Sequence, residues 1–401
     1  MEFLRKIFHN QEKHFTKGGK LEKLFPLFEA TESFLFTSGT VTKTASHVRD
    51  VMDLKRMMMM VVYALIPTVI MALYNTGYQA NIALGKSGLT ELGNWRDAVI
   101  AFLGSGYSAQ SLWDNVIIGA LYFFPVYIVT IAVGGFWEVL FATIRNHEIN
   151  EGFLVTSLLF PLILPANIPY WQVAIGISFG VVIGKEVFGG VGMNILNPAL
   201  TARAFLFFAY PAQISGDKVW TAIDGFSQAT PLAQFADSAL KMSSFSWWDS
   251  FTGLIPGSMG ETSTIACLIG AAILIISGIG SWRIMLSIVI GMVFTSSLFN
   301  IITSSTNPMF AVTPAWHFVM GGFAFGTVYM ATDPVSAAMT QRGKYVYGLL
   351  IGVLVVLVRV LNPAFPEGMM LAILFMNVFA PIIDKIFINA NIKRRLARNV
   401  S

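Results

Sequence analysis

Long apolar runs separated by short polar connections dominate the chain from residue 57 onward. A helix of about 20 apolar residues is long enough to cross the hydrocarbon core of a bilayer. We expect about ten such helices, at residues 57–75, 116–141, 153–168, 171–189, 194–210, 263–279, 282–302, 315–332, 345–361 and 367–388. The pattern predicts an all-α, polytopic membrane protein.

The third and fifth of these runs are interrupted. Pro161 and Pro165 lie in the third run, and Pro198 and Arg203 lie in the fifth. Proline removes a backbone donor and clashes with the preceding helical turn, so we expect broken or tilted helices at both places.

Composition agrees with a bilayer as the solvent. Of 401 residues, 55% are hydrophobic and 12% are charged, whereas soluble domains average about 25% charged residues. No long polar stretch after residue 57 suits a separate globular domain. We therefore expect one membrane domain preceded by a polar N-terminal arm, residues 1–56.

The basic residues mark the sides of the membrane. Ten of the 26 Lys and Arg residues precede residue 57 and five follow residue 384, and such an excess is typical of cytoplasmic segments. We expect both termini, including the basic tail 389–401, to be cytoplasmic and the 211–262 loop to be external. This distribution is a topology signal and not a nucleic-acid-binding surface.

Cys267 is the only cysteine. Iron–sulfur clusters are held by several thiolates, so this chain alone can hold neither a cluster nor an internal disulfide. Any redox chemistry in it requires an organic cofactor.

A weak internal repeat relates the two halves of the chain. Residues 195–200 (Ile-Leu-Asn-Pro-Ala-Leu) resemble residues 360–365 (Val-Leu-Asn-Pro-Ala-Phe). Each segment follows a helix with paired glycines, Gly176 and Gly180 in one, Gly348 and Gly352 in the other. Because five crossings separate the copies, we expect two inverted five-helix repeats, residues 57–210 and 263–388. The alternative is chance similarity among helices whose small residues permit close packing.

The external loop contains a hydroxyl-bearing turn. Its residues are Asp224, Gly225, Phe226, Ser227, Gln228, Ala229 and Thr230, followed by Pro231. By its chemistry alone this segment is a surface turn, because glycine and proline favour one. Its pattern, however, resembles the site at which a flavin transferase joins FMN to a threonine hydroxyl in a family of membrane subunits.

The resemblance covers nearly the whole chain. That family comprises the B subunits of sodium-translocating NADH:ubiquinone oxidoreductases and the related D subunits of Rnf complexes. Four further segments are similar to the B subunits, at residues 134–142, 147–153, 197–204 and 331–337. The long polar arm before residue 57 favours the B subunits over the Rnf type.

The resemblance implies a cofactor set and a place in a complex. Thr230 would carry FMN through a phosphoester, with riboflavin bound noncovalently. Electrons would come from an FMN on a neighbouring subunit and reduce ubiquinone near the cytoplasmic face, coupled to sodium export. The partners would be the other membrane, flavin and iron–sulfur subunits of an NADH-oxidising complex in a bacterial inner membrane.

Three polar side chains are candidate flavin contacts, namely Arg203, Asn194 and Asn197. An arginine can bind phosphate, and asparagine amides can bind a flavin ring. The structural alternatives are an arginine that reaches outward or bonds to backbone, and asparagines that cap a helix.

Acidic residues near the inner ends of helices form a second candidate group. An intramembrane carboxylate is costly unless it is paired, hydrated or bound to a cation. The resemblance implies sodium uptake at Glu138, Asp333, Asp384 and the arm residue Glu22. The alternatives are that Asp333 caps a turn, that Asp384 lies beside Lys385, and that Glu186 pairs with Lys185.

Two glycines and two aromatic residues are the candidate quinone site. Gly134 and Gly135 put bare backbone beside Phe136 and Trp137, where a flat head group could lie. Packing through small residues is the commoner role of such glycines in membranes, and the family resemblance favours the quinone.

The main rival is a channel or secondary transporter without a redox cofactor. Asn197-Pro198-Ala199 and Asn362-Pro363-Ala364 are similar to the paired triplets of aquaporins. The chain has too many helices for that family, and triplets of this kind arise readily at helix turns.

Overall fold

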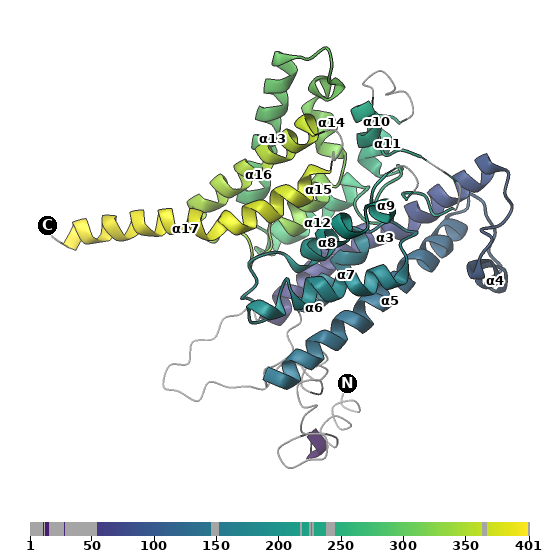
Figure 1. Ribbon diagram of the computed structural model, residues 1–401, viewed down its shortest axis with the longest axis horizontal. Helices are drawn as coiled ribbons and strands as arrows, with labels where there is room; N and C mark the ends of the chain where they lie inside the picture. Colours follow the sequence, from purple (N-terminus) through teal and green to yellow (C-terminus); the bar gives the residue numbers. More distant parts are fainter. Residues whose placement is uncertain are drawn as a thin grey trace.

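The computed structural model describes residues 11, 13–15, 28, 54–145, 152–216, 219–223, 226, 228–237, 245–362 and 367–399. Within these residues the chain is helical and contains no β-strand (Figure 1). The all-α expectation is therefore confirmed for the described part of the chain.

Six helical segments are long and apolar enough to cross a membrane. They are α3 (Leu54–Ser87), α5 (Leu112–Arg145), α7 (Tyr170–Val182) with the short η2 (Glu186–Phe188), α13 (Trp282–Ile302), α16 (Gln341–Leu361) and α17 (Gly368–Asn399). Together they make the chain a multi-pass membrane protein. Each coincides with one of the apolar runs in the sequence.

Three shorter apolar helices lie among them. These are α6 (Gly152–Leu162), α8 (Pro198–Ala209) and α12 (Thr264–Ile276), of 11, 12 and 13 residues. At about 1.5 Å per residue none reaches across about 30 Å of hydrocarbon. The third run ends as a helix one residue after Pro161, as expected, whereas Pro198 begins α8 and Arg203 lies inside it without breaking it.

The eighth run differs from the continuous helix expected at 315–332. It is divided into α14 (Pro314–Val319), the single turn α15 (Phe323–Phe325) and the π-helical turn η5 (Gly326–Met330). Gly321 and Gly322 interrupt it with φ of +61° and +65°, a region that favours glycine.

Arg359 of α16 supplies hydrogen-bond donors to the backbone carbonyls that this interruption leaves without helical partners. Its fully buried guanidinium donates to the carbonyls of His317, Met320 and Gly321, at 2.9, 2.8 and 3.0 Å. Backbone groups freed at membrane depth need such partners because water is absent there.

The helices pack as two groups. In the first, α5 contacts α3, α6 and α7, and α7 contacts α8; in the second, α16 contacts α13 and α17. The contact of α8 with α17 joins the groups directly, and α12 links them by packing on α3 and on η5, which contacts α13 and α17 (Figure 1).

The paired glycines do not have equivalent neighbours in the two groups. A Cβ on Gly180 of α7 would meet the carbonyl of Pro198 in α8, whereas Gly352 of α16 packs against the backbone of Ile288 in α13. The inverted repeat therefore stays a prediction.

Short helices gather away from the C-terminal half of α17. They are α4 (Trp95–Phe102), α9 (Pro211–Ile214), α10 (Pro231–Asp237) and α11 (Trp247–Thr252). In Figure 1 they lie in the right half of the picture, with α10 and α11 above α9 and α4 at the right edge, while α17 extends to the left. Three of them, α9, α10 and α11, belong to the loop that the sequence places outside the membrane.

Candidate functional site

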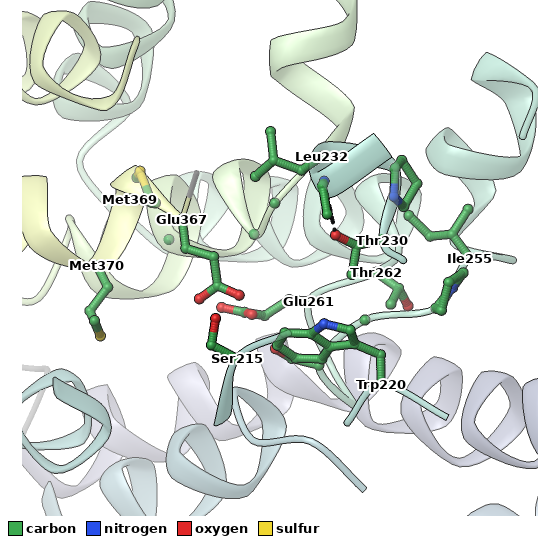
Figure 2. A pocket seen from close by; sticks show the side chains of 18 of the residues that line it. Ser215, Trp220, Thr230, Leu232, Ile255, Glu261, Thr262, Glu367, Met369 and Met370 are labelled. Carbon is green, nitrogen blue, oxygen red and sulfur yellow. Dashed lines mark hydrogen bonds between the residues drawn. The ribbon is translucent and has the colours of Figure 1, made fainter. Parts of the chain in front are cut away.

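A cavity of about 260 Å³ lies beside Thr230. Its wall combines α8, α10, η5, the first turns of α17 and the connection before α12. Trp220 lines the cavity with an aromatic side chain, and Met330, Met369 and Met370 line it with thioether side chains. Figure 2 shows this lining. Exposed Gly216 belongs to the rim, so the cavity opens to the surface.

Thr230 caps α10 from the edge of this cavity. Its Oγ1 accepts a hydrogen bond from the Ala233 N–H at 3.3 Å (Figure 2), and its carbonyl accepts from Gln234 N–H at 3.0 Å. The residue is partly exposed. Its hydroxyl is therefore held in place and still reachable. Ala229, another motif residue, accepts from the Gln234 side chain at 3.2 Å.

Arg203 enters the same cavity and is bound by two glutamates. Its Nη1 lies 2.9 Å from Glu261 Oε2 and its Nη2 lies 2.7 Å from Glu367 Oε2. The two carboxylates point toward one another beside Ser215 (Figure 2). Arg203 thus joins the end of the 211–262 loop, through Glu261, to the residue that precedes α17, Glu367. Its role as a flavin contact stays a prediction.

A second, smaller cavity of about 70 Å³ brings together several of the predicted residues. Asn194, Asn197, Asp333 and Lys185 all line it. Asn194 donates to the Leu196 carbonyl at 2.9 Å. Asn197 is the N-cap of α8 and accepts from the N–H groups of Ala199 and Leu200.

The two cavities lie on either side of a thin wall. Pro198 lines the second cavity and Leu200, two residues later in α8, lines the first. Tyr329 lines the second and its neighbour Met330 lines the first. Residues two apart in an α-helix point about 200° away from one another, so Pro198 and Leu200 face opposite sides of α8, and a single layer of helix, about 10 Å across, forms the wall.

Glu138 is buried and belongs to an ionic network. Its Oε1 is in contact with the Lys185 ammonium, which also lies 3.5 Å from Glu186 Oε1. Arg145 Nη1 lies 3.5 Å from Glu186 Oε2 and donates to the Glu186 carbonyl at 2.7 Å. The expected pairing of Glu186 with Lys185 is present, and Lys185 also pairs with Glu138.

The two remaining acids hold turns together. Asp333 accepts from Ser336 Oγ at 2.8 Å and from Val335 N–H at 3.2 Å. Asp384 accepts from the N–H groups of Met339 and Thr340, at 2.7 and 2.9 Å, and so anchors the start of α16. The contacts of Asp333 agree with the turn-capping alternative, whereas those of Asp384 are with the start of α16 and not with its neighbour Lys385. The sodium role of both acids stays a prediction.

The candidate quinone residues fall into two environments. A Cβ on Gly134 would lie 2.5 Å from the Phe153 ring, so Gly134 is a packing position. A Cβ on Gly135 would meet Phe153 at an ordinary 3.7 Å. Phe136 is 58% exposed, and Trp137 donates to Ser178 Oγ at 2.9 Å. Of the four residues, Phe136 is exposed, Gly135 and Trp137 are partly exposed, and Gly134 is buried.

Four predicted residues lie outside the described part of the chain, namely Glu22, Asp224, Gly225 and Ser227. Three others were missed by the sequence reasoning, namely Glu261, Glu367 and Trp220. Glu261 lies just before the apolar run at 263–279, and Glu367 begins the run at 367–388. An acidic residue at the start of an apolar run could have indicated a functional or ion-paired position. Nothing in the sequence singles out Trp220.

The second Asn-Pro-Ala triplet falls partly outside the described residues, at Pro363 and Ala364. Asn197 is buried and caps a helix, whereas Asn362 is exposed. The two asparagines therefore do not form the matched pair that a channel of the aquaporin kind would need.

Comparisons with known proteins agree on one family. A family described as NQR2, RnfD, RnfE matches residues 41–393. Two similar proteins are each named as the B subunit of a Na(+)-translocating NADH-quinone reductase. The one from Stutzerimonas stutzeri is 60% identical over 403 residues, covering 99% of each chain. The one from Chromohalobacter salexigens is 57% identical over 400 residues, covering 99% of this chain and 97% of the relative.

The match spans the helices that build both cavities as well as the loop that carries Thr230. This chain belongs to the NQR2, RnfD, RnfE family.

Proposed function

We propose that this chain is the flavin-carrying membrane subunit of a sodium-translocating NADH:quinone reductase. In this function it receives electrons from a neighbouring flavin subunit, passes them through covalent FMN and riboflavin to ubiquinone, and couples their passage to sodium export. Near-full-length relatives that carry the name of such a subunit support the assignment.

The observation that carries the proposal is the pair of cavities that meet at α8 and η5. Flavins supply one- and two-electron transfer when bound, and the protein supplies their position and electrostatics. A chain that relays electrons needs cofactor sites in close succession. Leu200 and Met330 line one cavity and Pro198 and Tyr329 line the other. A single layer of protein therefore separates the two candidate sites.

The residues of the first cavity fit FMN. Thr230 supplies the hydroxyl that the phosphoester requires, at a position that is held by Ala233 and open to the surface. Trp220 and the thioether of Met330 suit an aromatic ring, because aromatic and sulfur contacts are favourable there. Arg203, fixed by Glu261 and Glu367, keeps this wall rigid.

The polar residues of the second cavity suit a neutral flavin such as riboflavin, for which the surrounding helices would have to part, because the cavity of about 70 Å³ is smaller than the roughly 300 Å³ or more of a cofactor site. Asn194 and Asn197 place amides at its wall. Their oxygens and nitrogens can bond to the polar edge of a ring system. No phosphate partner is needed for a ligand that lacks a phosphate.

Quinone and sodium would use the inner end of the same helices. Gly135 and Phe136 would receive the quinone head group, with Gly134 and Trp137 shaping the helix behind them. Carboxylate oxygens suit a hard cation, so sodium would be handled by Glu138, Asp333, Asp384 and Glu22. Glu138→Ala should raise the sodium concentration for half-maximal turnover, and Glu138→Asp should raise it less.

The topology completes the proposal. The arm 1–56 and tail 389–401 would face the cytoplasm of a bacterial inner membrane, and the 211–262 loop would face outward. The segments 57–210 and 263–388 would be inverted repeats. The other membrane, flavin and iron–sulfur subunits would be its partners. A protein of the Rnf type would share the covalent flavin but pass electrons toward ferredoxin.

Flavin fluorescence tests the proposal directly. The denatured protein should fluoresce as flavin in a gel, and Thr230→Val should abolish the band while the complex still assembles. Thr262→Val is the matched control, because Thr262 lines the same cavity and its hydroxyl accepts from Asn75 instead. A fluorescent band that persists in Thr230→Val would remove the attachment site, and a colourless wild type would favour a transporter.

A further inference from the structure

The short helix α4 presents apolar side chains outward and charged side chains inward. Trp95 and Phe102, about two turns apart on one face, are 53% and 88% exposed, and Leu103 at the C-terminal end is 47% exposed. The charged residues of the helix, Arg96 and Asp97, are only partly exposed and bond within the protein. A surface helix in water has the opposite pattern. The outward face of α4 therefore suits an apolar surrounding.

Hydrogen bonds fix the level of α4 along α5. Arg96 Nε donates to the Leu121 carbonyl at 3.1 Å, and Ser105 Oγ, just after α4, donates to Asp114 Oδ1 at 2.8 Å. The helix and its following connection therefore lie beside about the first three turns of α5. The apolar run of α5 begins four residues after the helix starts. This part of α5 is where the hydrocarbon core of a bilayer would give way to water.

Exposed tryptophans surround α4 at this level. Trp113 at the start of α5 is 61% exposed and Trp171 at the start of α7 is 53% exposed, as Trp95 is. Arg96 Nη2 donates to the Tyr170 hydroxyl at 2.9 Å, so the start of α7 lies beside α4. Tryptophan and tyrosine are enriched at membrane–water interfaces because each combines an apolar ring with a polar edge. The group has the composition of an interfacial aromatic belt.

The apolar surface continues from this belt along a spanning helix. Residues eleven apart in an α-helix point in nearly the same direction, so Trp113 and Phe124 share a face of α5, and Ile128 lies one turn further along it. All three are exposed, and α5 is long and apolar enough to cross a membrane. The outward face of α4 thus adjoins the apolar surface that α5 presents to the bilayer.

We propose that α4 is an interfacial anchor whose face of Trp95, Phe102 and Leu103 lies in the headgroup layer of the phospholipid bilayer. Helices of this kind bury their apolar face about 5–10 Å into the boundary between headgroups and acyl chains. Arg96 and Asp97 hold the other face to the protein. The connection between α3 and α5 is then attached to the membrane as well as to the helices. This inference does not depend on the proposed electron and sodium functions.

A spin label at Phe102 tests the proposal in the purified complex, reconstituted in phospholipid nanodiscs. Phe102→Cys would carry a nitroxide, and the native Cys267 is buried. The signal of a wild-type complex treated with the same reagent is subtracted. Relaxation of the label by oxygen, which concentrates in lipid, is compared with relaxation by a water-soluble nickel chelate. Gln110→Cys is the matched control, because Gln110 is an exposed polar residue in the same connection.

The label at position 102 should respond to oxygen more than to the nickel chelate, as a phospholipid labelled on the upper part of its acyl chain does. The label at position 110 should respond mainly to nickel. A label at 102 that matched the one at 110 would place α4 in water and overturn the proposal. A label at 102 shielded from both reagents would mean that another protein covers this face, which also overturns it.

Hydrogen exchange of α4 in the same nanodiscs gives a second readout. Phe102→Ser removes an apolar side chain from the lipid, so protection of α4 should fall at least about tenfold, because burial of a phenylalanine is worth a factor of that size or more. Phe102→Leu keeps an apolar side chain and should retain most of the protection. Equal exchange in the serine and leucine variants would contradict an anchor in lipid.

Discussion

The side-chain amide of Asn197 lies 3.4 Å from the carboxylate of Asp333, 136 positions later in the chain. This contact joins the N-terminus of α8 to the turn that follows η5. The same asparagine caps α8 through its side-chain oxygen. One residue therefore fixes the corner at which the two cavities meet.

Substitutions at Asn197 should separate its two roles. Asn197→Ser keeps a capping oxygen and loses the Asp333 contact, whereas Asn197→Ala loses both. Loss of an N-cap typically costs about 1 kcal/mol, so only the alanine variant should lower the melting temperature. Both should lose noncovalent riboflavin, measured in the supernatant after acid precipitation. Full riboflavin in both variants would reassign Asn197 to structure alone.

The glycine pair on α5 should respond unequally to valine. Gly134→Val drives a side chain into Phe153, and overpacking of this kind costs about 1 to 3 kcal/mol. Gly135→Val meets no close contact, so it should assemble normally and impair quinone reduction. Turnover, quinone-site inhibitor sensitivity and flavin content should be measured together. Wild-type quinone kinetics in Gly135→Val would make both glycines packing positions.

The Arg203 cluster should dominate the stability of the first cavity. Arg203→Met leaves the carboxylates of Glu261 and Glu367 facing one another, and breaking a buried ion pair costs about 3 to 5 kcal/mol. The double variant Arg203→Met/Glu261→Gln removes one of the stranded charges and should recover part of the loss. Thermal melting of the complex should give the highest melting temperature for the wild type, a lower one for the double variant and the lowest for Arg203→Met. A double variant no more stable than the single one would contradict the ion-pair account.

The α4 segment should open in acid. Burial raises the pKa of Asp97, but hydrogen bonds from Tyr107 and from the backbone N–H groups of Asn94 and Leu92 outweigh it and hold the pKa below its ordinary value. Stabilisation from a carboxyl with a lowered pKa is present above its unfolded value of about 3.9 and is lost as pH falls through the folded value.

Hydrogen exchange of α4, corrected for its intrinsic pH dependence, measures this loss. Protection should be constant from about pH 7 to pH 5 and should fall below about pH 4. Asp97→Asn should show weak protection at every pH. An acid-induced loss of equal size in Asp97→Asn would show that another group is responsible.

Hydropathy predicted the spanning helices because a bilayer leaves the backbone few alternatives. It did not predict the break at Gly321 and Gly322, since a glycine pair in an apolar run is equally compatible with close helix packing. The break depends on Arg359, a residue 38 positions beyond Gly321, whose side chain caps the freed carbonyls.

The sequence predicted that buried charged residues would form ion pairs, but it did not predict which residues would pair. A buried arginine such as Arg203 requires carboxylates, yet its partners lie 58 and 164 positions away. Glu138 was correctly placed in the interior, but the ammonium beside it comes from Lys185, 47 positions later and in the turn that follows α7. The sequence indicates that a buried charge needs a partner of opposite charge, but only the packing of the helices determines which groups pair.

The wall between the cavities would also shape the electric field across the membrane. One cavity has exposed Gly216 at its rim and the other has exposed Pro334; in the proposed topology these rims face opposite sides of the membrane, and water and ions would reach the wall from both. The voltage of an energised membrane would then drop mainly across α8 and η5. A charge that moves past these few side chains does nearly all the electrical work of a full crossing, about 2.3 kcal/mol per 100 mV.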